Sequence, residues 1–431
     1  MKLAIIADDL TGANDSGVQL ARHGLKTTVL FDMDETSVKN YEAVVFDTDS
    51  RSIDRQEAYE KVKQVAEFLQ NAGFKNIFKK LDSTMRGNIG AEIDAVYEVL
   101  KPDFVMIAPG YPKNNRTILQ STHYLKGVPL GETEIAKDPK TPVTQSYLPE
   151  LLKEQTKQAI GTITVEDLKH GEPFIQEKLK DYFQKEITYL IIDSTEERHL
   201  EQILDYTKKL TYQFTWVGSA GIANYLPDYY AIPKRNSEVA IPKNTNPTLT
   251  VIGSVNQNSR AQMKVLLEKT NVHAIPFESH KAVSCNMERA TEIRSVYHEA
   301  MQKAKEGLDV LIYSTGEKED IEKAWSIGAL QGLSHTEISN EIVKAIGLVC
   351  SALLETGHFT GVTMTGGDTA KQICTLWDVK GFELLDELEI GVPISKFLGN
   401  DDLYVVTKAG GFGSEDVFIH AITKLKGDNE L

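Results

Sequence analysis

Cysteine is scarce in this sequence: only three occur among 431 residues, at Cys285, Cys350 and Cys374. Their spacing fits neither a zinc site nor a disulfide framework, so we expect thiols kept in a reducing compartment. Long apolar runs are missing too, since no stretch approaches the ~18 apolar residues of a membrane helix. The first residues lack the long apolar core and small-residue cleavage site of a signal peptide. These absences predict a cytoplasmic protein that does not bind membranes.

Positive charge is also in short supply. Lys and Arg number 47 against 62 Asp and Glu, which gives a formal net charge of −15. Such a balance disfavours nucleic acid as a partner, because binding it depends on many cations. An anionic ligand would therefore be held by a few local cations. Composition does not fix the oligomeric state, and a homodimer is left open.

Short β-branched runs alternate with longer helical patterns, which is typical of parallel sheets flanked by helices. The chain is longer than one hydrophobic core usually serves, and residues 233–247 are rich in proline, asparagine and charge. We predict an α/β protein of two domains, 1–235 and 248–431, joined by a linker at 236–247, each with a mostly parallel sheet flanked by helices. The active site is expected in the cleft between them. Residues 121–150, with Pro129, Pro139 and Pro142, are predicted to be an irregular excursion.

The predicted strands follow the buried runs of the sequence. They lie at 3–7, 27–31, 43–46, 76–80, 104–108, 189–192 and 214–217 in the first half, and at 248–252, 272–276, 310–313, 362–364 and 403–407 in the second.

Polar loops follow several strands of the first half. Because the carboxyl ends of parallel strands meet at one sheet edge, we expect these loops to form one pocket. The loops are ADDLTG (7–12), DTDSR (47–51), KKLDSTMRG (79–87), APGYPKNNR (108–116), DSTEE (193–197) and VGSAG (217–221).

The contents of this predicted pocket indicate its ligand. Three cations, Arg51, Lys80 and Arg86, could meet a carboxylate, which arginine grips through two parallel hydrogen bonds. The acceptors and donors suited to hydroxyl groups are Asp8, Asp9, Asp82, Ser83 and Thr84. An acid with several hydroxyls along its length, a sugar acid, satisfies both sets.

Each of these residues also has a purely structural interpretation. Asp9 or Thr11 could cap the following helix, and Arg86 could neutralise Asp82 without any ligand. Independent caps rarely converge on one sheet edge, however, so the set as a whole favours a binding site.

Glycine-rich loops follow the strands of the second half. Glycine lets backbone amides approach an anion, and a following helix N-terminus adds partial positive charge. The loops are GSVNQ (253–257), STG (314–316), TGGDTA (365–370) and KAGGFGSED (408–416), and they predict a phosphate site. Neither a Walker A motif nor a dinucleotide fingerprint is present. Two such domains together suggest a kinase.

A rival motif lies at TTVLFDMDETS (27–37), where a strand ends in Asp-x-Asp-x-Thr. In haloacid-dehalogenase-like phosphatases, residues placed as Asp32 and Asp34 act as nucleophile and as acid–base. The lysine and the acidic pair that this mechanism needs do not follow in order, and a charged turn also explains the segment. A second rival is a non-catalytic sensor of sugar acids, which would have no use for the phosphate-type loops.

Taken together, the motifs resemble those of the four-carbon acid sugar kinase family. They span nearly the whole chain: ADDLTGA (7–13), DSR (49–51), KKLDSTMRGNIGAE (79–92), APGYP (108–112), GS (253–254), TGGDTA (365–370) and KAGGFG (408–413). The resemblance implies an N-terminal domain that binds the acid and a C-terminal domain that binds ATP. It also implies phosphorylation of the terminal hydroxyl of threonate, erythronate or 3-oxo-tetronate. The 3-oxo-tetronate branch tends to lack the arginine of DSTMRG, so Arg86 favours D-threonate or D-erythronate.

The resemblance also implies site residues. The acid would contact Asp8, Asp9, Arg51, Lys80, Asp82, Ser83 and Arg86. ATP would contact Ser254, Gly366, Gly367, Asp368, Thr369 and Gly410, and Mg²⁺, whose protein ligands stay open, would bridge its phosphates. The base that accepts the hydroxyl proton is left open among Asp82, Asp9 and Asp368. We further expect Arg51 and Arg86 to clamp the substrate carboxylate.

Overall fold

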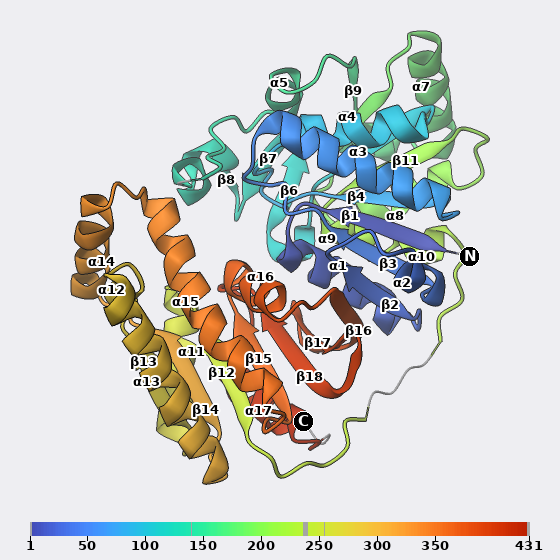
Figure 1. The fold of residues 1–431 in the computed structure, drawn as a ribbon. Coiled ribbons are helices and arrows are strands. Elements are labelled where there is room, and N and C mark those ends of the chain that lie inside the picture. The colour runs from blue at the N-terminus through green and yellow to red at the C-terminus, as the bar shows by residue number, and fades with distance from the viewer. Residues whose placement is uncertain (1, 139, 236–239, 254, 429–431) are drawn as a thin grey trace. The chain divides into compact units, whose positions relative to one another are not determined.

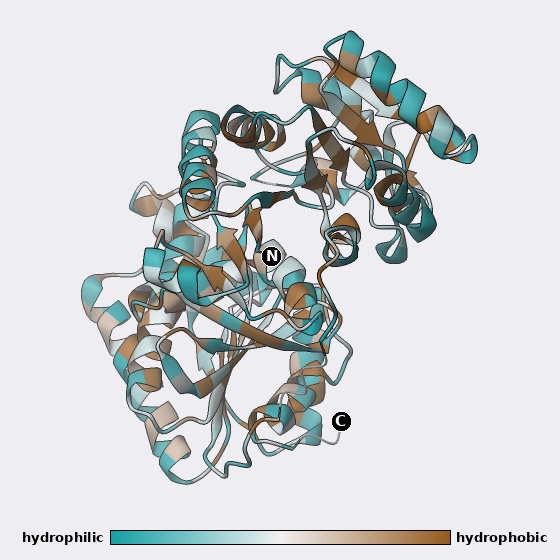
Figure 2. Ribbon diagram, turned by 90° about the vertical axis from the view of Figure 1, so that its right-hand side faces the viewer, coloured by the Kyte–Doolittle hydropathy of each residue, from teal (hydrophilic) through white to brown (hydrophobic). Residues whose placement is uncertain are grey.

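The computed structural model describes residues 2–138, 140–235, 240–253 and 255–428. The chain divides into two compact units, Met1–Ser237 and Glu238–Leu431. Both units are α/β, with a mostly parallel sheet flanked by helices, as predicted (Figure 1). Figure 2 shows the strands of both units as largely hydrophobic, while the helices carry hydrophilic residues along one side.

The sheet of the first unit is parallel throughout its order β2-β3-β1-β4-β11-β5-β10-β9. Its strands are β1 (Leu3–Ala7), β2 (Thr27–Leu30), β3 (Ala43–Asp47), β4 (Asn76–Lys80), β5 (Phe104–Ala108), β9 (Ile160–Ile163), β10 (Tyr189–Ile192) and β11 (Phe214–Gly218). All but β9 were predicted to within a residue. The five residues of β1 are all buried, as expected for a strand covered on both faces.

Ten α-helices lie in the described part of this unit. They are α1 (Leu10–Arg22), α2 (Glu35–Asn40), α3 (Arg55–Asn71), α4 (Ile89–Leu100), α5 (Leu148–Lys153), α6 (Val165–Lys169), α7 (Glu172–Gln184), α8 (Glu197–Thr207), α9 (Ala220–Ala223) and α10 (Leu226–Tyr229). Asp9 caps α1 by accepting from the Gly12 amide at 2.8 Å, and Gly24 follows the end of α1 with φ +93°.

The predicted excursion at 121–150 is more regular than expected. It belongs to a small antiparallel sheet of β6 (Arg116–Leu119), β7 (Thr122–Leu125) and β8 (Val128–Pro129). A short 3₁₀ turn precedes this sheet at Pro112–Asn114, and two more follow it at Leu130–Glu132 and Glu134–Lys137. Strands this short leave little periodicity to read in a sequence.

The second unit has the sheet order β13-β14-β12-β15-β18-β17-β16, parallel from β13 to β18 and antiparallel beyond. Its strands are β12 (Thr248–Ile252), β13 (His273–Phe277), β14 (Val310–Ser314), β15 (Gly361–Thr365), β16 (Gly381–Glu389), β17 (Val392–Phe397) and β18 (Asn400–Lys408). The antiparallel pair β16–β17 was not predicted.

Seven α-helices accompany this sheet in the described residues. They are α11 (Gln257–Lys269), α12 (Ser279–Ala282), α13 (Asn286–Lys305), α14 (Lys318–Leu330), α15 (His335–Glu355), α16 (Gly367–Leu376) and α17 (Val417–Leu425).

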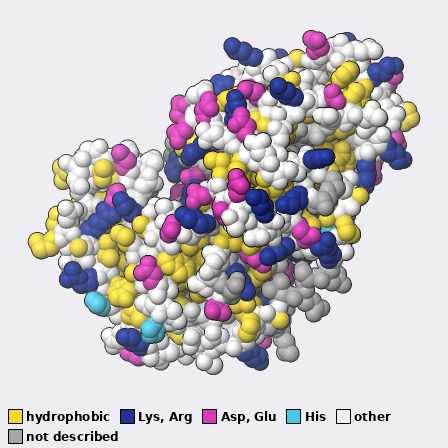
Figure 3. Space-filling model, turned by 45° about the vertical axis from the view of Figure 1, so that its right-hand side comes forward, with side chains coloured by type: hydrophobic (Ala, Val, Ile, Leu, Met, Phe, Trp, Pro, Cys, Tyr) yellow, Lys and Arg dark blue, Asp and Glu magenta, His cyan; other side chains and the backbone are white. Residues whose placement is uncertain are grey.

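Two surface properties bear on partners. No helix of the described chain has both the length and the apolar character needed to cross a membrane. On the face drawn in Figure 3, basic and acidic side chains are interspersed rather than gathered into fields of one sign.

Candidate functional site

The carboxyl ends of three neighbouring strands carry the predicted polar residues of the first unit. Strand register pairs Ala7 with Asp47 and with Lys80, so the residues that follow β1, β3 and β4 lie at one edge. These residues are Asp8 and Asp9 after β1, Arg51 in the loop after β3, and Asp82 and Arg86 after β4.

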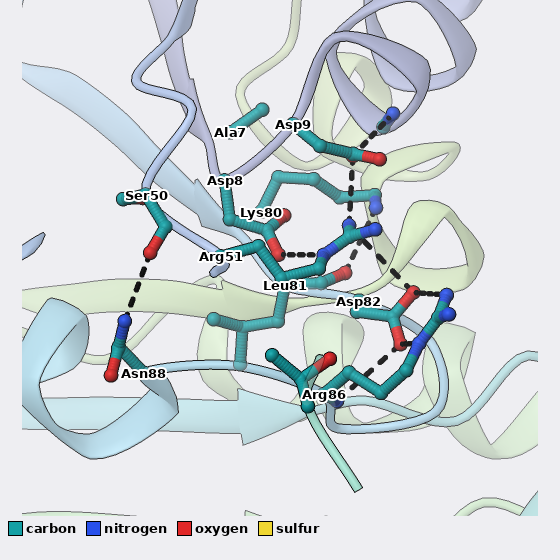
Figure 4. A network of polar contacts seen from close by, with 12 residues as sticks. Ala7, Asp8, Asp9, Ser50, Arg51, Lys80, Leu81, Asp82, Arg86 and Asn88 are labelled. Atoms are coloured by element: carbon teal, nitrogen blue, oxygen red, sulfur yellow. Dashed lines mark hydrogen bonds and ion pairs between the residues drawn. The ribbon is translucent and has the colours of Figure 1, made fainter. Parts of the chain in front are cut away.

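Arg51 joins the three aspartates at this edge (Figure 4). Its Nε donates to Asp8 Oδ2 at 2.7 Å, its Nη2 lies 2.8 Å from Asp9 Oδ1, and the same nitrogen lies 3.7 Å from Asp82 Oδ1. The side chain of Asp8 is 2% exposed and that of Asp9 is 25% exposed. Asp9 is thus the more accessible of the two carboxylates.

Arg86 binds the same Asp82 from the other side. Its Nε and Nη2 donate to the two carboxylate oxygens at 2.8 and 3.1 Å, and its Nη1 donates to Asp138 at 3.1 Å. Thr84 adds a hydroxyl hydrogen bond to Asp82. The predicted structural pairing of Arg86 with Asp82 therefore exists in this structure, together with a partner, Asp138, that was not predicted.

The three aspartates differ in acidity. Burial raises the pKa of Asp8, but the charges of Arg51 and Lys79 outweigh it and leave that pKa lowered. Burial likewise opposes ionisation of Asp82, yet Arg51 and Arg86 hold its pKa well below the ordinary value. Burial raises the pKa of Asp9, where the compensation from Arg51 is partly cancelled by the charge of Asp8.

The remaining predicted residues of this unit lie in the same loops. The Lys80 ammonium donates to the Leu81 carbonyl at 2.8 Å, and Ser83 is half-buried beside Asp82 in the sequence. A cavity of about 240 Å³ adjoins Arg51 and is lined by Met85, Gly87, Asn88 and residues 140–145 among others. Its size suits a small molecule.

A second lysine, Lys79, lies buried in β4 next to Lys80 and holds neighbouring elements of the site together. It is fully buried, lies 2.7 Å from the buried carboxylate of Glu92, and donates to the Ile6 carbonyl at 3.2 Å. The tie links β4, α4 and the end of β1. Lys79 and Glu92 both belong to the motif at 79–92, but their pairing was not predicted, because it depends on how α4 packs against β4.

The glycine loops of the second unit also share one sheet edge. Register pairs Ile252 with Thr365, and Thr365 with Lys408, so the residues that follow β12, β15 and β18 are neighbours. Gly366 has φ +96°, a conformation that other residues rarely adopt, and the helix α16 begins directly after it. A Cβ on Gly253 would lie 2.1 Å from Thr369 Oγ1, so only glycine allows this close approach.

The predicted nucleotide residues take different places at this edge. Gly367, Asp368 and Thr369 form the first turn of α16, where Asp368 is exposed and Thr369 is buried. Gly410 lies in the loop after β18, and its carbonyl accepts from Ser259 at 3.0 Å. Ser254 lies outside the described residues.

Lys408 organises the loop that contains Gly410. Its ammonium is buried and donates to the carbonyls of Ala409, Gly410 and Phe412 at 2.8, 3.1 and 3.0 Å. Burial lowers the pKa of Lys408 to about 8. The sequence analysis placed Lys408 at the start of the glycine loop 408–416 but did not predict this role for its side chain.

The rival phosphatase motif has a structural explanation. Asp34 caps α2: its carboxylate accepts from the Thr36 amide at 3.2 Å and from the Ser37 amide at 2.8 Å. Asp32 is exposed on the strand-to-helix connection. Among the described residues, no group of three or more His, Cys, Asp or Glu side chains could hold a metal ion.

Comparison with known proteins bears directly on these two edges. Residues 3–226 match the family described as a sugar-binding N-terminal domain, and residues 249–418 match the one described as a nucleotide-binding C-terminal domain. The chain belongs to the four-carbon acid sugar kinase family. As a member of that family it is a phosphotransferase with a hydroxyl group as acceptor.

Relatives of this kinase span almost its whole length. It is 29% identical to the D-threonate kinase of Salmonella typhimurium, covering 98% of each chain. It is 26% identical to the D-erythronate kinase of Heliobacterium modesticaldum (96% and 94% covered) and to the 3-oxo-tetronate kinase of Brucella melitensis (99% and 97% covered).

Solved structures share the fold of the kinase. A protein of Salmonella typhimurium LT2 superposes with a TM-score of 0.82 at 25% identity, covering 98% of this chain and 99% of that one. The Haemophilus influenzae protein HI1011 gives a TM-score of 0.77 at 24% identity, with 97% and 99% covered.

Proposed function

We propose that this kinase transfers the γ-phosphoryl group of ATP to the terminal (4-) hydroxyl of D-threonate or D-erythronate. The observation that carries the proposal is the network of Arg51 with Asp8, Asp9 and Asp82 at the carboxyl edge of the first sheet. The network combines cations with rigidly held carboxylates, which suit hydroxyl groups. Relatives of the chain are named as kinases of D-threonate and D-erythronate.

The second unit supplies the nucleotide side of the proposal. The amides of the first turn of α16 and the glycine loops at 253 and 409–413 offer donors for phosphate oxygens. Mg²⁺ normally keeps several waters and takes only one or two protein carboxylates beside the phosphates. Asp368, exposed in that first turn, has the chemistry to be such a ligand. When bound, Mg²⁺ neutralises charge on the transferred group.

Of the two candidate bases in the first unit, Asp82 and Asp9, Asp9 fits the role best. Asp82 is held by two arginines and Thr84, and its lowered pKa makes it a poor proton acceptor. Asp9 is 25% exposed and its pKa is raised, so it is reachable and more basic. Asp8 is almost entirely buried against Arg51, and this contact orients the ion pair of Arg51 with Asp9.

The test is ADP release from ATP–Mg²⁺ with D-threonate, D-erythronate and 3-oxo-tetronate, each compared with a reaction lacking acid. We expect D-threonate or D-erythronate to give the highest kcat/KM. A preference for 3-oxo-tetronate would change the assigned substrate but keep the assignment as a kinase. Hydrolysis of phosphate esters that requires Asp32, with no acid-dependent ADP release, would contradict the proposal.

A further inference from the structure

The charges around Arg51 and Arg86 are unfavourable for an anionic substrate. Among the described residues, four carboxylates contact these two guanidinium groups: Asp8, Asp9, Asp82 and Asp138. In each arginine, Nε and at least one Nη already contact one of these carboxylates. A substrate carboxylate placed between them would meet more negative charge than positive charge. The predicted clamp by Arg51 and Arg86 therefore lacks a cation that is available to the ligand.

Arg116 is a cation of the same unit that is not neutralised in this way. Among the described residues, the structure gives its side chain one hydrogen bond, from Nη1 to the Asn114 carbonyl at 2.7 Å. Its Nε is buried and has no acceptor. A buried guanidinium donor without an acceptor is costly, which is a reason to expect a ligand or ordered water there.

The fold holds Arg116 at the edge where the aspartates lie. Tyr111, in the loop after β5, bonds to Arg116 through both backbone groups, at 2.7 and 3.1 Å. The next residues of β6 are bonded to the chain just beyond β10, since the Ile118 amide donates to the Ser194 carbonyl at 2.9 Å. Strands β5, β11 and β4 are consecutive neighbours in the sheet, so the loop after β5 shares its edge with Asp82.

The buried face of the β6–β7 hairpin carries a second unsatisfied group. Register pairs Ile118 with His123 and Arg116 with Leu125, so all four side chains lie on one face of the hairpin. Ile118 and Leu125 pack in the same hydrophobic cluster as Leu81, which directly precedes Asp82.

His123 itself is fully buried, and neither ring nitrogen has a hydrogen-bond partner in the described structure. Burial lowers the pKa of His123 to about 4, a shift that the charge of Asp82 opposes and that of Arg116 reinforces. The ring is therefore neutral at pH 7, and it adds polarity next to Arg116 without adding charge.

We propose that Arg116 is the substrate-binding residue that meets the carboxylate of the four-carbon acid. This assignment rests on the proposed function. Arg51 and Arg86 then keep the aspartates in place for the hydroxyl groups, and Arg116 supplies the positive charge for the acid end. Arg116 thus sets the preference for an acid over an uncharged analogue of the same length.

The test compares D-threonate with D-threonamide, which has the same carbon chain and hydroxyls but no charge. Their binding is measured by calorimetry and their phosphorylation by ADP release, for the wild-type enzyme and for Arg116→Gln. We expect Arg116→Gln to raise the KM for the acid by at least about 30-fold, the cost of truncating a paired charge, while the KM values for amide and ATP change little. Lys126→Gln, an exposed charge removed from the end of the same hairpin, should behave as wild type.

The outcomes separate the two proposals. If the wild-type enzyme is active on the acid, and Arg116→Gln has the same ratio of KM for the acid to KM for the amide as the wild type, the assignment of Arg116 alone is overturned. A wild-type enzyme that neither binds nor phosphorylates any four-carbon acid overturns the proposed function and this assignment with it. If Arg116→Gln does not fold, Arg116→Lys replaces it. That variant keeps the charge but loses the paired donors, so a wild-type KM for the acid would contradict the assignment.

Discussion

Asp8 and Asp9 are adjacent in the chain, and Arg51 binds them through different nitrogens, Nε at 2.7 Å and Nη2 at 2.8 Å. One guanidinium therefore holds two carboxylates that would otherwise repel each other. The side chain of Asp8, which follows the buried strand β1, is thereby fixed in orientation, as a site for a small polyol requires.

Arg51→Gln should destabilise the protein strongly at neutral pH. It leaves the buried Asp8, together with Asp9 and Asp82, without their shared cation, and breaking such a buried pair costs about 3–5 kcal/mol. Urea unfolding at pH 7 measures this loss.

The cost of Arg51→Gln should depend on pH in a defined direction. In the wild-type protein the pKa values of Asp8 and Asp82 are lowered, so their contribution is complete above the unfolded carboxyl pKa of about 3.9 and is lost as pH falls below it. The difference in unfolding free energy between wild type and variant should therefore shrink as the pH falls from about 5 to about 2. A difference that stays constant over this range would mean that Arg51 acts through packing rather than charge.

Lys79→Met should destabilise the protein by about 3–5 kcal/mol, because it leaves the buried carboxylate of Glu92 without its partner. The double variant Lys79→Met/Glu92→Leu removes both charges and should recover most of this loss. Thermal and urea unfolding of the two single variants and the double variant measure the coupling. Additive losses would show that the 2.7 Å ion pair carries no coupling energy.

Lys408→Met should weaken ATP binding without affecting the acid. The variant removes three hydrogen bonds to the carbonyls of the 409–412 loop, and we expect the KM for ATP to rise by about tenfold or more. Steady-state kinetics with each substrate varied in turn separates the two KM values.

The titration of Lys408 offers an independent check. Its pKa is about 8 in the folded state and about 10.4 when unfolded, so between these values the unfolded chain binds more protons. This group should make the unfolding free energy rise with pH in that window, and Lys408→Met should lose the rise. If the unfolding free energies of the two proteins depended on pH in the same way, the lowered pKa of Lys408 would be contradicted.

Asp34→Ala should cost about 1 kcal/mol of stability through loss of the α2 cap and leave kinase activity nearly intact. Asp32→Asn should change neither stability nor activity appreciably. Parallel assays of ADP release and of phosphate-ester hydrolysis check both variants. Loss of all activity in Asp32→Asn would revive the phosphatase alternative.

Much of the fold was accessible from the sequence because its strands are buried on both faces. Runs such as LAIIA and FVMIA are continuous and apolar, and their ends coincide with β1 and β5. The pair β16–β17 escaped because β16, FELLDELE after its first glycine, carries as many acidic as apolar residues and is only partly buried. β9 and the hairpin β6–β7 were missed because their four-residue strands are only partly buried and polar in part. The four-residue strands β2 and β10, which are buried throughout, were predicted.

The candidate site was predicted as a set of residues but not as a set of contacts. Parallel topology alone brings Asp8, Arg51 and Asp82 to one edge. Which carboxylate each arginine binds depends on side-chain geometry, and the partner of Arg86, Asp138, comes from a distant loop. Arg116 stood in a predicted pocket loop, but only the contacts of the other arginines distinguish it as a cation without a carboxylate partner in the described structure.

The most direct test of the central claim is to identify the product formed from D-threonate or D-erythronate and ATP–Mg²⁺. We predict one new monophosphate of the acid, formed in equal amount to ADP, with phosphorus coupled to the protons of the terminal carbon in a ³¹P–¹H correlation spectrum. Formation of ADP and inorganic phosphate without any phosphorylated acid, or phosphate attached at an inner hydroxyl, would contradict the account.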